Sequence, residues 1–267
     1  KILALIDLND TVNGVVKSAI NLGQFFGADI VLFYVKKALD VVNKESQLSA
    51  MRTINSESVA VDKEIKKLVE PFKDAYKGNI KTTFAFGNVK NQIADYIEKV
   101  NPDIIVLGKR KTKLLKIVGD KVTDYILNNY QGTVLIANKK REISVNDNLT
   151  LGAFNISNDE LENGIAEKLV NQSKVRLQEF ALVDTSANNH EETVKNDRST
   201  EKYLFEENDN AIPSLSNYLT NSKVNLLMVD RNGKEKSSGR FKSQLKELIN
   251  KSEVSMLLPS LRDFDLN

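Results

Sequence analysis

Cysteine and tryptophan are absent from the 267 residues, and histidine occurs only once, as His190. Without cysteine there are no disulfides and no thiol chemistry, which is compatible with a reducing compartment, so we expect a cytoplasmic protein. One histidine and no cysteine cannot assemble most metal sites or nucleophilic triads. We therefore assign no catalytic residue and no metal ligand, and we do not expect an enzyme.

Long apolar runs and an excess of one charge are also lacking. No run approaches the roughly 20 apolar residues that cross a bilayer. The 38 basic and 36 acidic residues leave a formal charge of +2. We therefore expect neither a membrane nor a nucleic acid as partner. The 41% hydrophobic content suffices for one large domain or two ordinary ones.

The first half of the chain alternates between short apolar runs and one-sided helical patterns. The runs predict strands over residues 2–6, 30–35, 82–86, 104–107 and 134–136. The helical spacing predicts helices over 12–26, over 54–76 with a bend near Pro71, over 89–100, and from Gly119 onward. Strands that alternate with helices predict parallel βαβ units and a doubly wound sheet.

The second half repeats the first. Residues 150–183 lie over residues 2–35 at a constant offset of 148, which places Phe154 on Ile6 and Asn155 on Asp7. Further along, the offset becomes 122 and aligns 226–229 with 104–107 and 256–258 with 134–136. The difference of 26 residues predicts that the second copy lacks the helix at 54–76 and has a mobile polar loop, 185–200, in its place. Ser157 and Glu160 form a capping-box pattern at the start of the repeated first helix.

The predicted fold class is α/β, with two tandem doubly wound five-stranded parallel sheets flanked by helices and a trimmed second copy. The predicted boundaries are 1–138 for the first domain, 139–148 for a polar linker, 149–260 for the second domain and 261–267 for a C-terminal tail.

A basic loop follows the strand at 104–107. Gly108 ends that strand, and Lys109, Arg110 and Lys111 come next, ahead of the helix that Gly119 opens. Anions bind in α/β folds at such glycine-punctuated loops between a buried strand and a helix N-terminus. A solvated charged surface is the alternative interpretation. No aromatic residues interleave with the basic ones to stack on bases, which argues against nucleic acid.

Residues 1–138 resemble the universal stress protein family in four stretches, which are ILALID, VLFYV, NPDIIVLGKR and TVLIA. The resemblance implies a Rossmann-like sheet of the adenine nucleotide alpha hydrolase type. It also implies an adenine-nucleotide site, for ATP, ADP or AMP, at the carboxyl ends of the strands. In a tandem chain it further implies an internal pseudo-dimer in which the last strands of the two domains pair.

The nucleotide-binding members resemble one another in a loop of the form G-x2-G-x9-G-[ST]. Here Gly108 and Gly119 match the first and last glycines, but Lys111 stands at the middle glycine and Asp120 at the hydroxyl position. The spacing before Gly119 is seven residues instead of nine. The phosphate half of the site is therefore degenerate.

The adenine half is better preserved. The resemblance places Asp7 near the adenine and Val35 at a backbone contact with the base, although an aspartate there also caps the next turn. The candidate nucleotide-binding residues are Asp7, Val35, Gly108, Lys109, Arg110, Lys111 and Gly119. We expect a universal-stress-protein-like regulatory protein with weak or lost ATP binding that acts through unidentified protein partners. The alternative is an adenine-nucleotide-binding sensor that uses the site in the first domain.

Overall fold

The structure is a computed structural model that describes residues 1–8, 12–37, 47–109, 121–139, 143, 149–173, 175–183, 200–231 and 238–260. Within these ranges, no helix has the length and apolar character that a membrane span needs. Of the loop predicted at 185–200, residues 185–199, which include His190, lie outside the described residues, as does the predicted tail at 261–267, whereas Thr200 is the first residue of a strand.

The described residues of the first half form five strands and four α-helices in regular alternation, as the sequence pattern predicts. The elements are β1 (Ile2–Ile6), α1 (Val12–Phe26), β2 (Ile30–Lys36), α2 (Gln47–Val69), β3 (Ile80–Phe86), α3 (Val89–Val100), β4 (Ile104–Gly108), α4 (Lys121–Asn129) and β5 (Thr133–Ala137). Pro71 lies in a 3₁₀ turn, Glu70–Phe72, that ends α2. The turn follows from proline chemistry, because proline has no N–H for the next helical hydrogen bond.

The second half contains a shorter version of the same series. Its elements are β6 (Leu151–Phe154), α5 (Asn158–Leu161), α6 (Gly164–Gln172), β7 (Leu177–Val183), β8 (Thr200–Glu206), α7 (Ala211–Asn221), β9 (Leu226–Val229), α8 (Ser238–Lys251) and β10 (Ser255–Leu258). Residues 37–79 connect β2 to β3, whereas only residues 184–199 connect β7 to β8. No described helix of the second half corresponds to α2.

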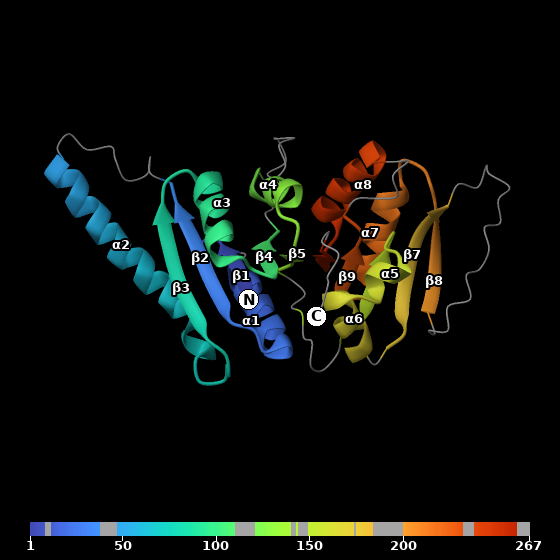
Figure 1. The fold of residues 1–267 in the computed structure, drawn as a ribbon. Helices are drawn as coiled ribbons and strands as arrows, with labels where there is room; N and C mark the ends of the chain where they lie inside the picture. The colour runs from blue at the N-terminus through green and yellow to red at the C-terminus, as the bar shows by residue number, and fades with distance from the viewer. Residues whose placement is uncertain are drawn as a thin grey trace.

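All ten strands form one sheet, in the order β3-β2-β1-β4-β5-β10-β9-β6-β7-β8 (Figure 1). Neighbouring strands are parallel within each half, and β5 pairs with β10 in antiparallel orientation at the centre. The fold class predicted from the sequence is therefore confirmed, with the two five-stranded halves joined edge to edge.

Two apolar layers cover the faces of this sheet. One face packs against α1, α2, α5 and α6, and the other against α3, α4, α7 and α8. Each layer contains buried residues from both halves, so the core continues across the junction. Ile143, in the segment predicted as a polar linker, is fully buried in the first layer, and the side chain of Asn21 donates a hydrogen bond to its carbonyl. The connection is thus anchored to α1.

The strand register corrects the predicted offset of 148. Leu151 lies opposite Leu226 in the second half, as Ile2 lies opposite Ile104 in the first. The counterpart of Ile2 is therefore Leu151, and Phe154 corresponds to Leu5, one residue from the predicted match to Ile6. The shift matters because a one-residue slip sends a side chain to the opposite face of the sheet. In the structure Phe154 and Leu5 share one apolar layer, while Ile6 belongs to the other.

The capping box predicted at Ser157 is present. The Ser157 backbone N–H donates to Glu160 Oε2 (2.9 Å), and the Glu160 N–H donates to Ser157 Oγ (3.3 Å). The helix that it starts is only α5, because Glu162 and Asn163 separate α5 from α6, whose first residue, Gly164, has a φ of 62°. The counterpart of α1 is therefore broken into two short helices.

Candidate functional site

Three of the candidate residues meet at the carboxyl edge of the first half. Ile6 lies opposite Tyr34 and Leu5 lies opposite Leu107, so the carboxyl ends of β1, β2 and β4 lie side by side, with Asp7 just after β1, and Val35 and Gly108 in the last two residues of β2 and β4. Asp7, Val35 and Gly108 are all partly buried. Arg110, Lys111 and Gly119 lie outside the described residues, as does Asp120. These three residues therefore lie at the edge where ligands bind in open α/β sheets.

Lys109 points toward the second half of the molecule. Its backbone N–H continues the sheet by donating to the Ala137 carbonyl (3.1 Å). Its side-chain ammonium donates a hydrogen bond to the backbone carbonyl of Ser252, and Glu253 lies near enough to favour its charge. Ser252 directly follows the last residue of α8. The first cation of the predicted phosphate loop is therefore bound at the C-terminal end of a helix in the other half, where the helix dipole favours positive charge.

Arg231 makes the reciprocal contact, and the sequence analysis did not single it out. It follows β9 as Lys109 follows β4, at the equivalent position under the offset of 122. Its Nη2 donates to the Ile126 carbonyl in the last turn of α4 (3.1 Å), and its Nη1 donates to the Gly132 carbonyl just before β5 (3.1 Å). Each half thus sends one cation to the end of the final helix of the other half. The same offset applied to the basic loop is the signal that could have identified Arg231.

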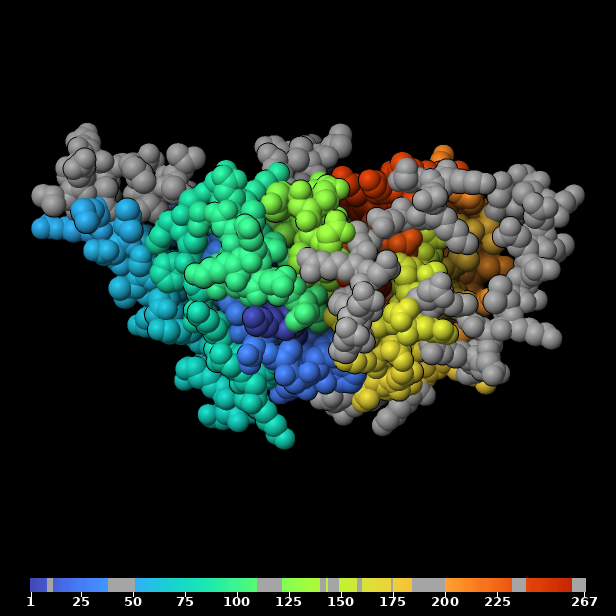
Figure 2. All heavy atoms as spheres, in the orientation of Figure 1, coloured from blue at the N-terminus to red at the C-terminus, as the bar shows by residue number. Residues whose placement is uncertain are grey.

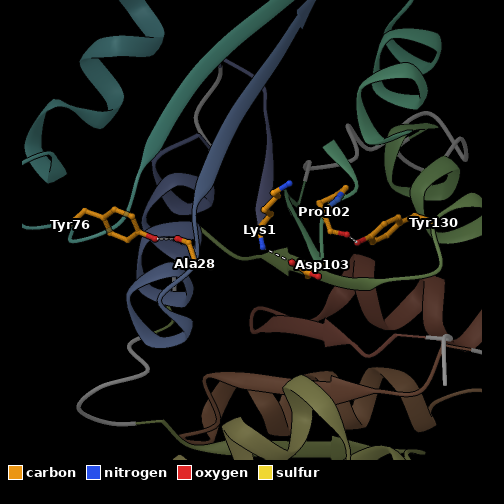
Figure 3. A network of polar contacts seen from close by, with 6 residues as sticks. All are labelled: Lys1, Ala28, Tyr76, Pro102, Asp103 and Tyr130. Carbon is orange, nitrogen blue, oxygen red and sulfur yellow. Dashed lines mark hydrogen bonds and ion pairs between the residues drawn. The ribbon is translucent and has the colours of Figure 1, made fainter. Parts of the chain in front are cut away.

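Tyr130 fixes the segment that receives Arg231. Its backbone N–H donates to the Ile126 carbonyl (2.9 Å), and its hydroxyl donates to the Pro102 carbonyl (2.6 Å), which ties the end of α4 to the start of β4 (Figure 3). Tyr76 anchors the Ala28 carbonyl in the same way near the start of β2. The Ile126 carbonyl therefore accepts two hydrogen bonds, one from its own half and one from Arg231.

Burial changes the acidity of both cations. It lowers the pKa of the Lys109 ammonium from its usual 10.5 to about 8, although Glu253 opposes the shift. It likewise lowers the pKa of Arg231 to about 10, opposed by Tyr130. The folded-state pKa of Lys109 is below its unfolded value, so between pH 8 and 10.5 the folded chain binds fewer protons. The contribution of Lys109 to stability is thus complete above pH 10.5 and is lost as the pH falls toward 8.

At the equivalent edge of the second half, the register that makes Leu151 the counterpart of Ile2 places Ile156 at the position of Asp7. Asp230 occupies the position of Gly108 and is buried. Asn155, which follows β6 and corresponds to Ile6 in this register, has a φ of 52°, the left-handed conformation that asparagine tolerates better than most residues. No group of three or more His, Cys, Asp or Glu side chains suited to a metal ion occurs among the described residues.

Comparisons with known proteins give a consistent family and fold. The model of the universal stress protein family matches residues 1–138. A universal stress protein from Archaeoglobus fulgidus DSM 4304 has a similar structure, with a TM-score of 0.70 and 14% identity over 98% of this chain and 96% of that one. A putative universal stress protein from Pseudomonas aeruginosa UCBPP-PA14 matches with a TM-score of 0.61 and 12% identity over 97% and 92% of the two chains. No curated protein matched the chain.

Proposed function

Because the chain belongs to the universal stress protein family, we propose that it is a stress-response regulator that does not bind ATP tightly and acts by contacting other proteins. One observation carries the proposal. Lys109, the first cation of the loop that would cradle phosphates, is bound to the Ser252 carbonyl of the other half. A lysine held in this way would have to break its contact at the junction before it could reach a phosphate.

The second half supports the same conclusion. Arg231 stands at the position of Lys109 and is also bound across the junction. Both copies of the position are therefore used to hold the halves together. We infer that contacts between the two halves have replaced phosphate contacts at this position, and that no catalytic activity accompanies the fold.

A surface suited to partner contacts lies on the second half. The helix α2 covers one face of β3, whereas no described helix covers the equivalent face of β8. Leu204 on that face is 65% exposed. In this proposal, the face of β8 that corresponds to the covered face of β3 is where a protein partner would be sought.

The test is calorimetric titration of the purified chain with ATP, ADP and AMP in the presence of magnesium. We expect no saturable heat at micromolar nucleotide, because Lys109 is bound at the junction and Lys111 stands at the position of the middle glycine. Binding with a dissociation constant in the low micromolar range or below would contradict the proposal.

A nucleotide sensor is the second candidate, and the convergence of Asp7, Val35 and Gly108 at one edge favours it. It predicts that Asp7→Ala weakens the binding of adenine nucleotides about tenfold, in line with one lost hydrogen bond to a charged group. The binding of inorganic tripolyphosphate, which lacks the base, should not change. Equal affinities of the parent and Asp7→Ala chains for ATP would exclude this role of Asp7.

A further inference from the structure

The junction between the halves has a local twofold axis. At its centre Leu135 pairs with Leu257, and the two residues are equivalent under the offset of 122. On either side, Ile136 pairs with Met256 and Val134 pairs with Leu258. The offset of 122 converts each of these two pairs into the other. All these side chains are apolar and buried. These six positions therefore carry no charge that would select the pairing of unlike halves over a dimer of two first halves or of two second halves.

The helices beside the strands break this symmetry. Lys246 on α8 lies across the junction from Asp124 on α4, with Nζ 3.3 Å from Oδ1. Lys246 is the counterpart of Asp124 under the offset of 122. The twofold axis therefore brings each of these two residues next to its equivalent in the other half. In Figure 2 the green atoms of α4 lie beside the red atoms of α8 along the top of the molecule.

We infer that Asp124 and Lys246 make the α4–β5 surface specific for an unlike half. Two first halves in this arrangement would bring two Asp124 carboxylates together, and two second halves would bring two Lys246 ammonium groups together. Only the pairing of a first half with a second half gives opposite charges. The partner that this surface fits is therefore a β10-edged half carrying a cation at the position of Lys246.

A loop contact beside the axis also disfavours a pair of two first halves. Glu253, which favours the charge of Lys109, is the counterpart of Gln131. In a pair of two first halves Lys109 would meet the neutral Gln131 in place of a carboxylate. Glu253 thus disfavours a pair of two first halves only. In a pair of two second halves Arg231 would meet Glu253, so the two Lys246 ammonium groups are what oppose that pairing, and both contacts act by charge, the kind of contact that discriminates between partners more than it adds affinity.

The test is a double-mutant cycle in the full chain, with Asp124→Lys, Lys246→Asp and the two combined. Lys246 is 59% and Asp124 34% exposed, so the pair is a surface pair of modest strength. Each single reversal is expected to lower the unfolding midpoint by about 2 °C. The combined variant should return to within about 0.5 °C of the parent because it restores opposite charges. The differences in unfolding midpoint between the single variants and the parent should be smaller in 0.5 M salt, because salt screens exposed charges.

Refolding at high protein concentration gives a second measurement. In each single variant the charges at positions 124 and 246 have the same sign, so the pairing of the two halves within one chain is as repulsive as the pairing of two like halves. The fraction of dimer that each single variant shows on size exclusion should therefore exceed that of the parent at least twofold. The combined variant should match the parent. The control is Lys66→Asp, which reverses a charge on α2 away from the junction (58% exposed). Single reversals that behave as the control does, or a combined variant as destabilised as the sum of the two, would overturn the inference.

Discussion

Leu257→Asp is expected to destabilise the whole chain by about 4–6 kcal/mol, the largest effect of any single change considered for this protein. Leu257 is fully buried and pairs with Leu135 at the centre of the junction. The substitution removes the buried side chain of a leucine and places a carboxylate without a cation in an apolar layer. Because both layers contain residues from both halves, the two halves should lose structure in one transition.

Urea unfolding monitored by circular dichroism measures this effect. The matched control is Leu204→Asp, the same chemical change at a side chain on β8 that is 65% exposed, where a loss of less than about 1 kcal/mol is expected. A Leu257→Asp chain whose first half still unfolds at the parent midpoint would show that the halves are independent, contrary to the continuous core described above.

Arg231→Met is expected to cost about 2–3 kcal/mol, because it removes two hydrogen bonds from a charged group to buried carbonyls. Methionine keeps much of the volume of the arginine stem, so the loss reports mainly on the hydrogen bonds. The Ile126 carbonyl retains the Tyr130 N–H, whereas the Gly132 carbonyl loses the donor that Arg231 supplies. The free energy of unfolding from urea titration is the measurement.

Two comparisons sharpen this prediction. Arg240→Met removes an exposed ion pair with Glu207 and should change stability by less than about 1 kcal/mol. Lys109→Met should also cost less than Arg231→Met, because the lysine makes one such hydrogen bond and burial already disfavours its charge. A cost for Arg231→Met no larger than that for Arg240→Met would mean that the buried guanidinium does not hold the halves together.

Most of the fold was predictable because it depends on local patterns. The spacing of apolar residues predicted the strands and helices of residues 1–138, and the capping box predicted the start of α5 at Asn158. The offset of 122 was confirmed by the register, since Ser255 pairs with Leu226 as Thr133 pairs with Ile104. These features follow from short stretches of sequence whose periodicity or chemistry matches one structure.

The features that the sequence did not predict depend on tertiary contacts. The offset of 148 failed because β6 and β7 are displaced from it in opposite directions. An alignment without gaps has a single offset and cannot represent both displacements. The strand β8 was not identified, because its sequence TEKYLFE has charges on the face that lacks a covering helix and so no apolar run. The roles of Lys109 and Arg231 depend on carbonyls in the other half, and no local pattern indicates a backbone acceptor so distant in the chain.

The most direct test of the account is the pKa of Lys109, followed by NMR of the side chain in selectively labelled protein and assigned with Lys109→Arg. If the ammonium is bound at the junction, it should titrate near pH 8, and millimolar ATP with magnesium should leave that value unchanged. A pKa near the ordinary 10.5, or one that rises when ATP is added, would show that Lys109 is available to phosphate and would contradict its assignment to the junction.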